Sequence, residues 1–158
     1  MTHKSDFTGD EWARIVRAPF VAGMAITLAD PGGPIEAAKE SMASLRSATN
    51  PPTREELVAD VALDIQAQMQ QHHNPAQGFR PTGGAAPGEQ VLDELREVHA
   101  LVASRASAPE AAAFGAWLVS TAQDAANAAK EGGFMGFHAE RVSARESEMI
   151  ERVRQAVS

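Results

Sequence analysis

The chain has 158 residues, of which 44% are hydrophobic and 22% are charged, a composition typical of one globular domain with a sizeable core. Its 14 basic and 21 acidic residues give a net charge of -7, which argues against nonspecific binding to nucleic acid or to an anionic membrane. The sequence contains no cysteine, which excludes disulfides and thiolate chemistry. No positively charged stretch precedes an apolar run at the start, so we expect no signal peptide and a cytoplasmic protein.

Six helix-start signals divide the chain. In four of them a serine or threonine is followed three residues later by glutamate, the capping-box pattern in which each side chain satisfies a free backbone amide. These pairs are Thr8/Glu11, Thr53/Glu56, Ser107/Glu110 and Ser143/Glu146. The other two starts place Pro34 and Pro87 at the first helical position. Because tyrosine is absent and β-branched residues are sparse, we expect no sheet. The sequence predicts an all-α, single-domain bundle of about six helices over residues 1–158.

The first predicted helix, residues 9–29, contains an uncharged run over 18–29 that has no polar face. We interpret it as the central core helix, since the run is shorter than the roughly 20 apolar residues that cross a bilayer. Pro19 predicts a kink or a break. Four alanines form a line along one side, and we expect them to pack closely against the alanine-rich second half of the helix predicted over 109–130. They are Ala18, Ala22, Ala25 and Ala29.

The next two helices are predicted to be amphipathic. The inner stripe of the second is Ile35, Ala38, Met42 and Leu45, and that of the third is Leu57, Val58, Val61, Ile65 and Met69. The outer face of the third carries Asp60, Asp64, Gln68 and His72. A divalent cation is one interpretation of that face, but we favour a solvated surface and predict no metal, because bundle metal sites use inward-pointing Glu-x-x-His motifs and the sequence has none.

Residues 71–88 form a long irregular stretch rich in glycine and proline. Loops of this length inside a domain are either functional or mobile. Phe79 and Arg80 could hold it against the body or against a partner. A mobile connector and a lid or docking loop therefore both remain open.

The fourth helix, about 87–104, carries His99 at the edge of its apolar face. The run Leu92-x-x-Leu95-x-x-x-His99, followed by the capped helix from Ser107, resembles the proximal-histidine region of globins over about a quarter of the chain. This resemblance implies a haem ligand at His99. The chain departs from the globin pattern because no phenylalanine lies between residues 42 and 53 and a long loop separates the third and fourth helices. We interpret His99 as a hydrogen-bonded structural histidine and predict no cofactor.

A Gly/Phe-rich connector over 131–142 precedes the last helix, about 144–157. Three large apolar residues in a glycine-rich turn predict either a plug under the bundle or a ligand-pocket wall or partner contact. They are Phe134, Met135 and Phe137, with His138 beside them. We expect a pocket, if one exists, between this connector and the first helix near Pro19.

Common catalytic motifs are missing from the sequence, including the phosphate-binding G-x-x-x-x-G-K-[ST], H-E-x-x-H and G-x-S-x-G patterns. The first interpretation is therefore a noncatalytic helical module that binds a protein partner or itself, for example as a homodimer. The alternative is a small-molecule, haem or metal-binding helical protein, possibly an enzyme. The candidate pocket or contact residues are Pro19, Phe20, Met24, His99, Phe134, Met135, Phe137 and His138.

Overall fold

The computed structural model describes residues 2–81, 86–130 and 142–158. Over these ranges it contains a short 3-10 helix, six α-helices and no strand. The elements are η1 (Lys4–Asp6), α1 (Gly9–Ala29), α2 (Pro34–Thr49), α3 (Glu56–Gln70), α4 (Pro87–Arg105), α5 (Ala108–Lys130) and α6 (Ala144–Ala156). The predicted all-α bundle of about six helices is confirmed.

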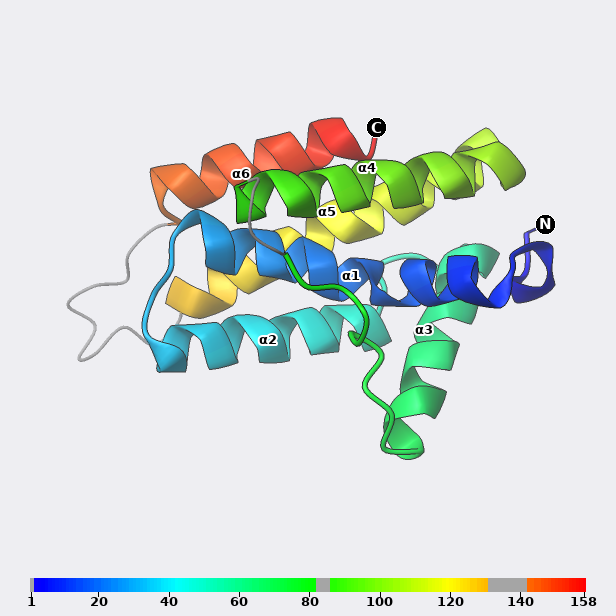
Figure 1. Ribbon diagram of the computed structural model, residues 1–158, viewed down its shortest axis with the longest axis horizontal. Helices are drawn as coiled ribbons and strands as arrows, with labels where there is room; N and C mark the ends of the chain where they lie inside the picture. The colour runs from blue at the N-terminus through cyan, green and yellow to red at the C-terminus, as the bar shows by residue number, and fades with distance from the viewer. Residues whose placement is uncertain (1, 82–85, 131–141) are drawn as a thin grey trace.

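Helix α1 lies at the centre of the bundle and contacts each of the five other α-helices. Figure 1 shows α2 along one side of it, α4 and α6 along the other, and α5 behind. Ile15, Ala22, Ala25 and Ile26 are fully buried. A helix with so few polar side chains lowers its free energy by losing water contact on most sides, at roughly 25 cal/mol per Å² of apolar surface.

Helix α1 is continuous through Pro19, which excludes a break in the helix there. The run over 18–29 is shorter than a membrane span, but the whole of α1 has 21 residues. Within the described ranges, α1 is the one helix long and apolar enough to cross a membrane, and 56% of its most apolar stretch is buried among the other helices.

Three of the four capping boxes are present, at Thr8/Glu11, Ser107/Glu110 and Ser143/Glu146. The fourth prediction is wrong. Helix α3 is capped by Glu55, whose carboxylate accepts a hydrogen bond from the Val58 amide at 3.2 Å. The Thr53 hydroxyl oxygen instead accepts from the Glu55 amide at 3.1 Å and shapes the turn before the helix.

The Ser107/Glu110 box also holds the start of the chain. Both Glu110 oxygens accept a bond from Thr2, one from its amide and one from its hydroxyl, each at 2.8 Å. The Ser107 amide donates to the same carboxylate at 2.8 Å. These donors favour the ionised form, so the Ser107 amide first, and then Thr2, lower the pKa of Glu110 from 4.5 to about 2.

Helix α2 is rotated relative to the prediction. Ile35 and Met42, expected to face inward, are 73% and 64% exposed. The buried residues are Glu40, Ala43, Ser44, Ser47 and Ala48. Except for Glu40, the side chains on this face are small, so α2 can approach α1 and α5 closely. Hydrogen bonds satisfy the polar groups of the face. The Ser47 carbonyl accepts from Trp117 Nε1 at 2.9 Å, and the hydroxyls of Ser47 and Thr121 lie 3.0 Å apart.

Helix α5 packs against both α1 and α2, and most extensively against α2. Its alanine-rich second half is buried at Ala122, Ala125, Ala126 and Ala129. Close packing of α5 on α1 was predicted from the alanine line. The larger contact with α2 was not, because it depends on the polar face of α2.

The outer face of α3, predicted to be solvated, is partly covered: Asp60, Asp64 and Gln68 are half-buried, whereas His72 is exposed. Asp64 accepts a hydrogen bond from Trp12 Nε1 at 2.8 Å, and Asp60 lies 3.4 Å from the His3 ring. The N-terminal segment and the start of α1 therefore cover part of this face. Within the described ranges, no group of three acidic or histidine side chains is arranged to hold a metal ion.

Candidate functional site

A cavity of about 700 Å³ lies between α1, α2, the end of α3 and the segment that follows α3. We call it the α1–α2–α3 pocket. It is lined by Phe20, Gly23, Met24, Thr27, Glu40, Ser41, Ser44, Leu45, Met69 and residues 72–76. In Figure 1 the segment after α3 is the green coil that returns from the far end of α3 and crosses in front of α1.

The apolar part of the pocket comes from three helices. Phe20 and Met24 lie one turn apart on α1, Leu45 comes from α2, and Met69 comes from the last turn of α3. Met69 is 36% exposed although it lies on the apolar side of α3. Methionine side chains are flexible and polarizable, so this wall can adapt to ligands of different shape.

The polar part of the pocket is centred on Glu40, whose residue is only 2% exposed. The Thr27 hydroxyl donates a hydrogen bond to its carboxylate. The Ser44 hydroxyl donates to the Glu40 backbone carbonyl at 2.9 Å. Both hydroxyl hydrogens are thus directed at acceptors on α2, and an ionisable group is held at the edge of an apolar cavity.

A close approach of α1 to α2 forms the floor of the pocket. A Cβ atom added to Gly23 would lie 1.9 Å from the Ser44 Oγ and 2.9 Å from its Cβ. Glycine at this position allows the two backbones to come together. The pocket opens beyond this contact, toward the end of α3.

The segment after α3 forms the rim. His72 adopts a positive φ of 61°, and the His73 amide donates to the Gln68 carbonyl at 2.8 Å, which closes the C-terminus of the helix. Both imidazoles are exposed. The Asn74 side chain accepts from the Ala76 amide at 3.0 Å. A second hollow of about 400 Å³ shares His73, Asn74 and Pro75 and lies on the α1–α3 side of the same segment.

The continuation of this segment is held over α1. Phe79 is half-buried and packs on the core, whereas Arg80 is exposed. Gly78 has a φ of 108° and passes so near Arg17 that an added Cβ would lie 2.7 Å from its Nη1. The part of the predicted 71–88 loop that is described therefore contacts the body of the protein and borders the pocket.

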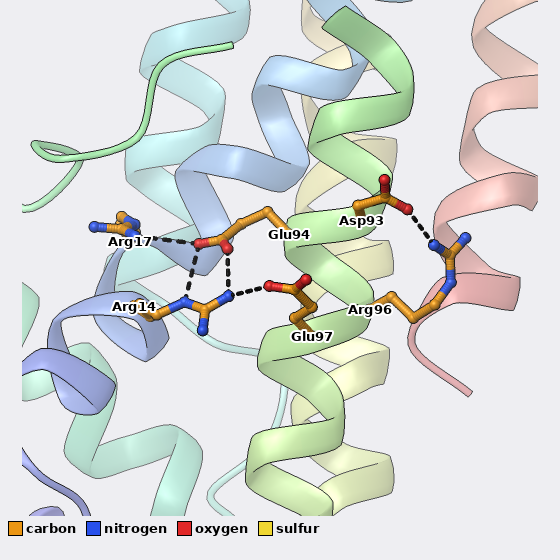
Figure 2. A network of polar contacts seen from close by, with 6 residues as sticks. All are labelled: Arg14, Arg17, Asp93, Glu94, Arg96 and Glu97. Atoms are coloured by element: carbon orange, nitrogen blue, oxygen red, sulfur yellow. Dashed lines mark hydrogen bonds and ion pairs between the residues drawn. The ribbon is translucent and has the colours of Figure 1, made fainter. Parts of the chain in front are cut away.

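An ion-pair network beneath this segment joins α1 to α4. Figure 2 shows Arg14 and Arg17 of α1 directed at Glu94 of α4, with Glu97 one turn further along. Arg14 Nη2 donates to Glu94 at 2.5 Å and to Glu97 at 2.8 Å, and Arg17 donates to Glu94 at 3.2 Å. The hydrogen bond that Arg14 donates to the Glu94 carboxylate raises the pKa of Arg14. The charges are balanced, so we regard the network as a structural link between the helices.

The structure brings together only part of the predicted site. Phe20 and Met24 line the pocket, whereas Pro19 is buried in α1 outside its lining. His99 lies elsewhere, and its Nε2 is 3.1 Å from the Ala111 carbonyl oxygen, so the ring is hydrogen-bonded within the bundle. The remaining candidates, Phe134, Met135, Phe137 and His138, fall outside the described residues.

Sequence reasoning missed Glu40, Ser44 and the rim at residues 72–76. Glu40 was overlooked because the apolar stripe of α2 was assumed to face inward, which would have placed this carboxylate in water. The positive φ of His72 leaves no mark in the residue type, since glycine or asparagine is the usual signal. The glycine at position 23, in the middle of an apolar helix, was a signal of close helix packing.

Comparison of the chain with protein-family models, with curated proteins and with solved structures finds no match.

Proposed function

We propose that this protein is a noncatalytic helical module that binds a small apolar or amphipathic molecule in the α1–α2–α3 pocket. The observation that supports the proposal is the cavity of about 700 Å³, whose surface is mainly apolar although half of its lining residues carry polar side chains. Ligand sites have roughly this size, 300–1,000 Å³, and a mainly apolar surface. Thr27 and Ser44 donate to a carboxylate and to a backbone carbonyl, so neither of these two hydroxyls is paired with an imidazole of the kind that activates a nucleophile.

Fluorescence titration with the neutral dye Nile red tests this function. We expect a blue-shifted, saturable emission with one dye molecule per chain. Leu45→Trp places a bulky ring in the pocket and should lower the affinity for the dye by about tenfold or more, which corresponds to about 1.4 kcal/mol in binding free energy. Ala38→Trp is the matched control, because Ala38 is exposed on the same helix and does not line the pocket. Equal affinity of both variants and wild type would refute the proposal.

The outer face of α2 supports a second candidate function, self-association. Ile35, Ala38 and Met42 form an exposed apolar stripe at helical spacing. In an antiparallel pairing with the α2 helix of a second copy, the two stripes cover each other. A symmetric dimer uses the same patch on both subunits in this way.

Sedimentation velocity over a range of concentrations tests self-association. We expect a concentration-dependent dimer that Met42→Glu converts to a monomer. Leu63→Glu is the matched control, because Leu63 is 62% exposed on α3, away from this face. A wild-type protein that stays monomeric, or a dimer lost equally in both variants, would contradict the assignment.

A further inference from the structure

We infer that the α1–α2–α3 pocket and the second hollow together bind one single-chain amphiphile with an uncharged, hydroxyl-rich head. The apolar tail occupies the pocket, and the head occupies the second hollow. The inference rests on the proposed function of the pocket and specifies the chemistry of its ligand.

The two hollows are neighbours along α1. The α1 residues that line them include five at alternating steps of three and four, a spacing that places the five on one line along the helix. The last of these in the second hollow and the first in the pocket are one helical turn apart, about 6 Å. The five are Ala13 and Val16 in the second hollow and Phe20, Gly23 and Thr27 in the pocket.

The two hollows also meet on the other side. On α3, the consecutive residues Gln68 and Met69 line the second hollow and the pocket respectively. Residues 73–75 of the segment after α3 line both hollows, so this segment is their common wall. A ligand that occupies both hollows therefore lies across residues 73–75.

The hydrogen bonds of this wall are local. The His73 amide donates to the Gln68 carbonyl at the end of α3, and the Ala76 and Gln77 amides donate to the side chain and the carbonyl of Asn74 at 3.0 and 3.1 Å. Among the described residues, none from 74 to 81 is hydrogen-bonded to α1 or α2. The wall can therefore shift to admit a chain without breaking a bond to either helix.

The two hollows differ in chemistry. The pocket offers an apolar wall of Phe20, Met24, Leu45 and Met69, which suits an alkyl tail. Most of the second hollow's lining is polar, and it contributes three amide side chains and one imidazole, from Gln68, Asn74, Gln77 and His73.

This lining favours a head without charge. Within the described lining of the second hollow there is no acid, lysine or arginine, so an ammonium head would meet no carboxylate and an anionic head no basic side chain other than His73. A side-chain amide both donates and accepts, as a hydroxyl group does. The Gln77 amide has no hydrogen-bond partner among the described residues, so both its functions are open to a ligand. A head with several hydroxyl groups matches this surface.

Two probes with the same tail test the inference by NMR: octanol, and octyl glucoside below its critical micelle concentration. The methyl groups of Met24 and Met69 report on the pocket, the side-chain amides of Gln68 and Gln77 report on the second hollow, and Met42 lies outside both. We expect octanol to shift the two methyl signals alone. Octyl glucoside should shift the methyl and the amide signals together and bind about tenfold more tightly than octanol.

Gln77→Trp fills the second hollow and should lower the affinity for octyl glucoside to that for octanol, leaving octanol binding unchanged. Arg80→Trp is the matched control, because Arg80 is exposed on the same segment and lines neither hollow, and it should change neither affinity. Leu45→Trp, in the pocket, should weaken both probes.

The inference is overturned if octyl glucoside shifts the methyl signals without the amides, or if it binds no more tightly than octanol. It is equally overturned if Gln77→Trp leaves octyl glucoside binding intact or weakens both probes alike. In each of these cases the pocket function stands, whereas it fails if neither probe shifts Met24 or Met69. The amide shifts of the wild type decide the question even if Gln77→Trp does not fold.

Discussion

Replacement of Gly23 by alanine is expected to destabilise the protein, because it separates α1 from α2 at the floor of the pocket. The new Cβ would lie 1.9 Å from the Ser44 Oγ and 2.9 Å from the Ser44 Cβ, where ordinary contacts are 3.4–4 Å. Rotation of Ser44 relieves the first overlap but breaks its bond to the Glu40 carbonyl, worth about 1 kcal/mol. The second overlap remains, and overpacking of this kind costs about 1–3 kcal/mol.

Alanine is a better helix former than glycine by about 1 kcal/mol, which offsets part of this cost. We expect a net loss of about 1–3 kcal/mol in the free energy of unfolding, or a decrease in Tm of about 2–4 °C for each kcal/mol. Urea and thermal unfolding measure both quantities. Gly9→Ala is the control, since nothing lies within 4 Å of its added Cβ, and it should leave the stability unchanged or raise it.

A second substitution shows whether the Ser44 overlap is the cause. Ser44→Gly removes both overlapping atoms, so Gly23→Ala should become neutral or stabilising in that background. The difference between the two backgrounds is the coupling energy of a double-mutant cycle. Full stability of Gly23→Ala in the wild-type background, or an equal loss in both, would refute the close approach of the two helices.

Three further predictions concern Glu94, Glu110 and His72. Glu94→Gln should lower the free energy of unfolding by about 1–3 kcal/mol in urea titrations, because it removes the carboxylate that Arg17 and Arg14 share and leaves Arg14 with Glu97 alone. Glu97→Gln, at a side chain that is 67% exposed, should cost under about 0.5 kcal/mol. The pKa of Glu110 is about 2 in the folded state against 4.5 ordinarily, so the stability contributed by its ionised carboxylate is complete above pH 4.5 and disappears as the pH falls to about 2. The difference in free energy of unfolding between wild type and Glu110→Gln should therefore close over that range of pH. A difference independent of pH would contradict the role of the ionised carboxylate. His72→Gly should raise Tm by relieving a φ of 61°, worth about 0.5–1 kcal/mol, whereas Gln71→Gly, at a φ of -88°, should lower it.

Much of the fold could be read from local sequence signals. The starts of α1 and α6 were predicted because their capping boxes are complete within four residues and need no tertiary contact. The apolar run in α1 identified the central helix, since almost any arrangement would have to bury it. The cap of α3 was predicted two residues too early, at Thr53, because Glu55 supplies a competing cap within the same few residues.

The orientation of α2 could not be read in this way. Periodicity identifies which residues share a face, but it does not say which face another helix covers. The polar face of α2 is buried because glycine at position 23 admits Ser44, and because Trp117 and Thr121 satisfy Ser47. These partners lie far away in the sequence, and their contribution depends on three helices meeting at one place.

The sequence by itself determined the helical class, the number of helices, most of their ends and the central position of α1, because caps, prolines and apolar runs act over a few residues. Only the tertiary structure decided where a pocket lies. Phe20 and Met24 were candidates from the sequence, but Glu40, Ser44 and Met69 join them through the rotation of α2 and the course of the chain after α3. A pocket is a property of surfaces from separate segments, so its position depends on packing that no single segment encodes.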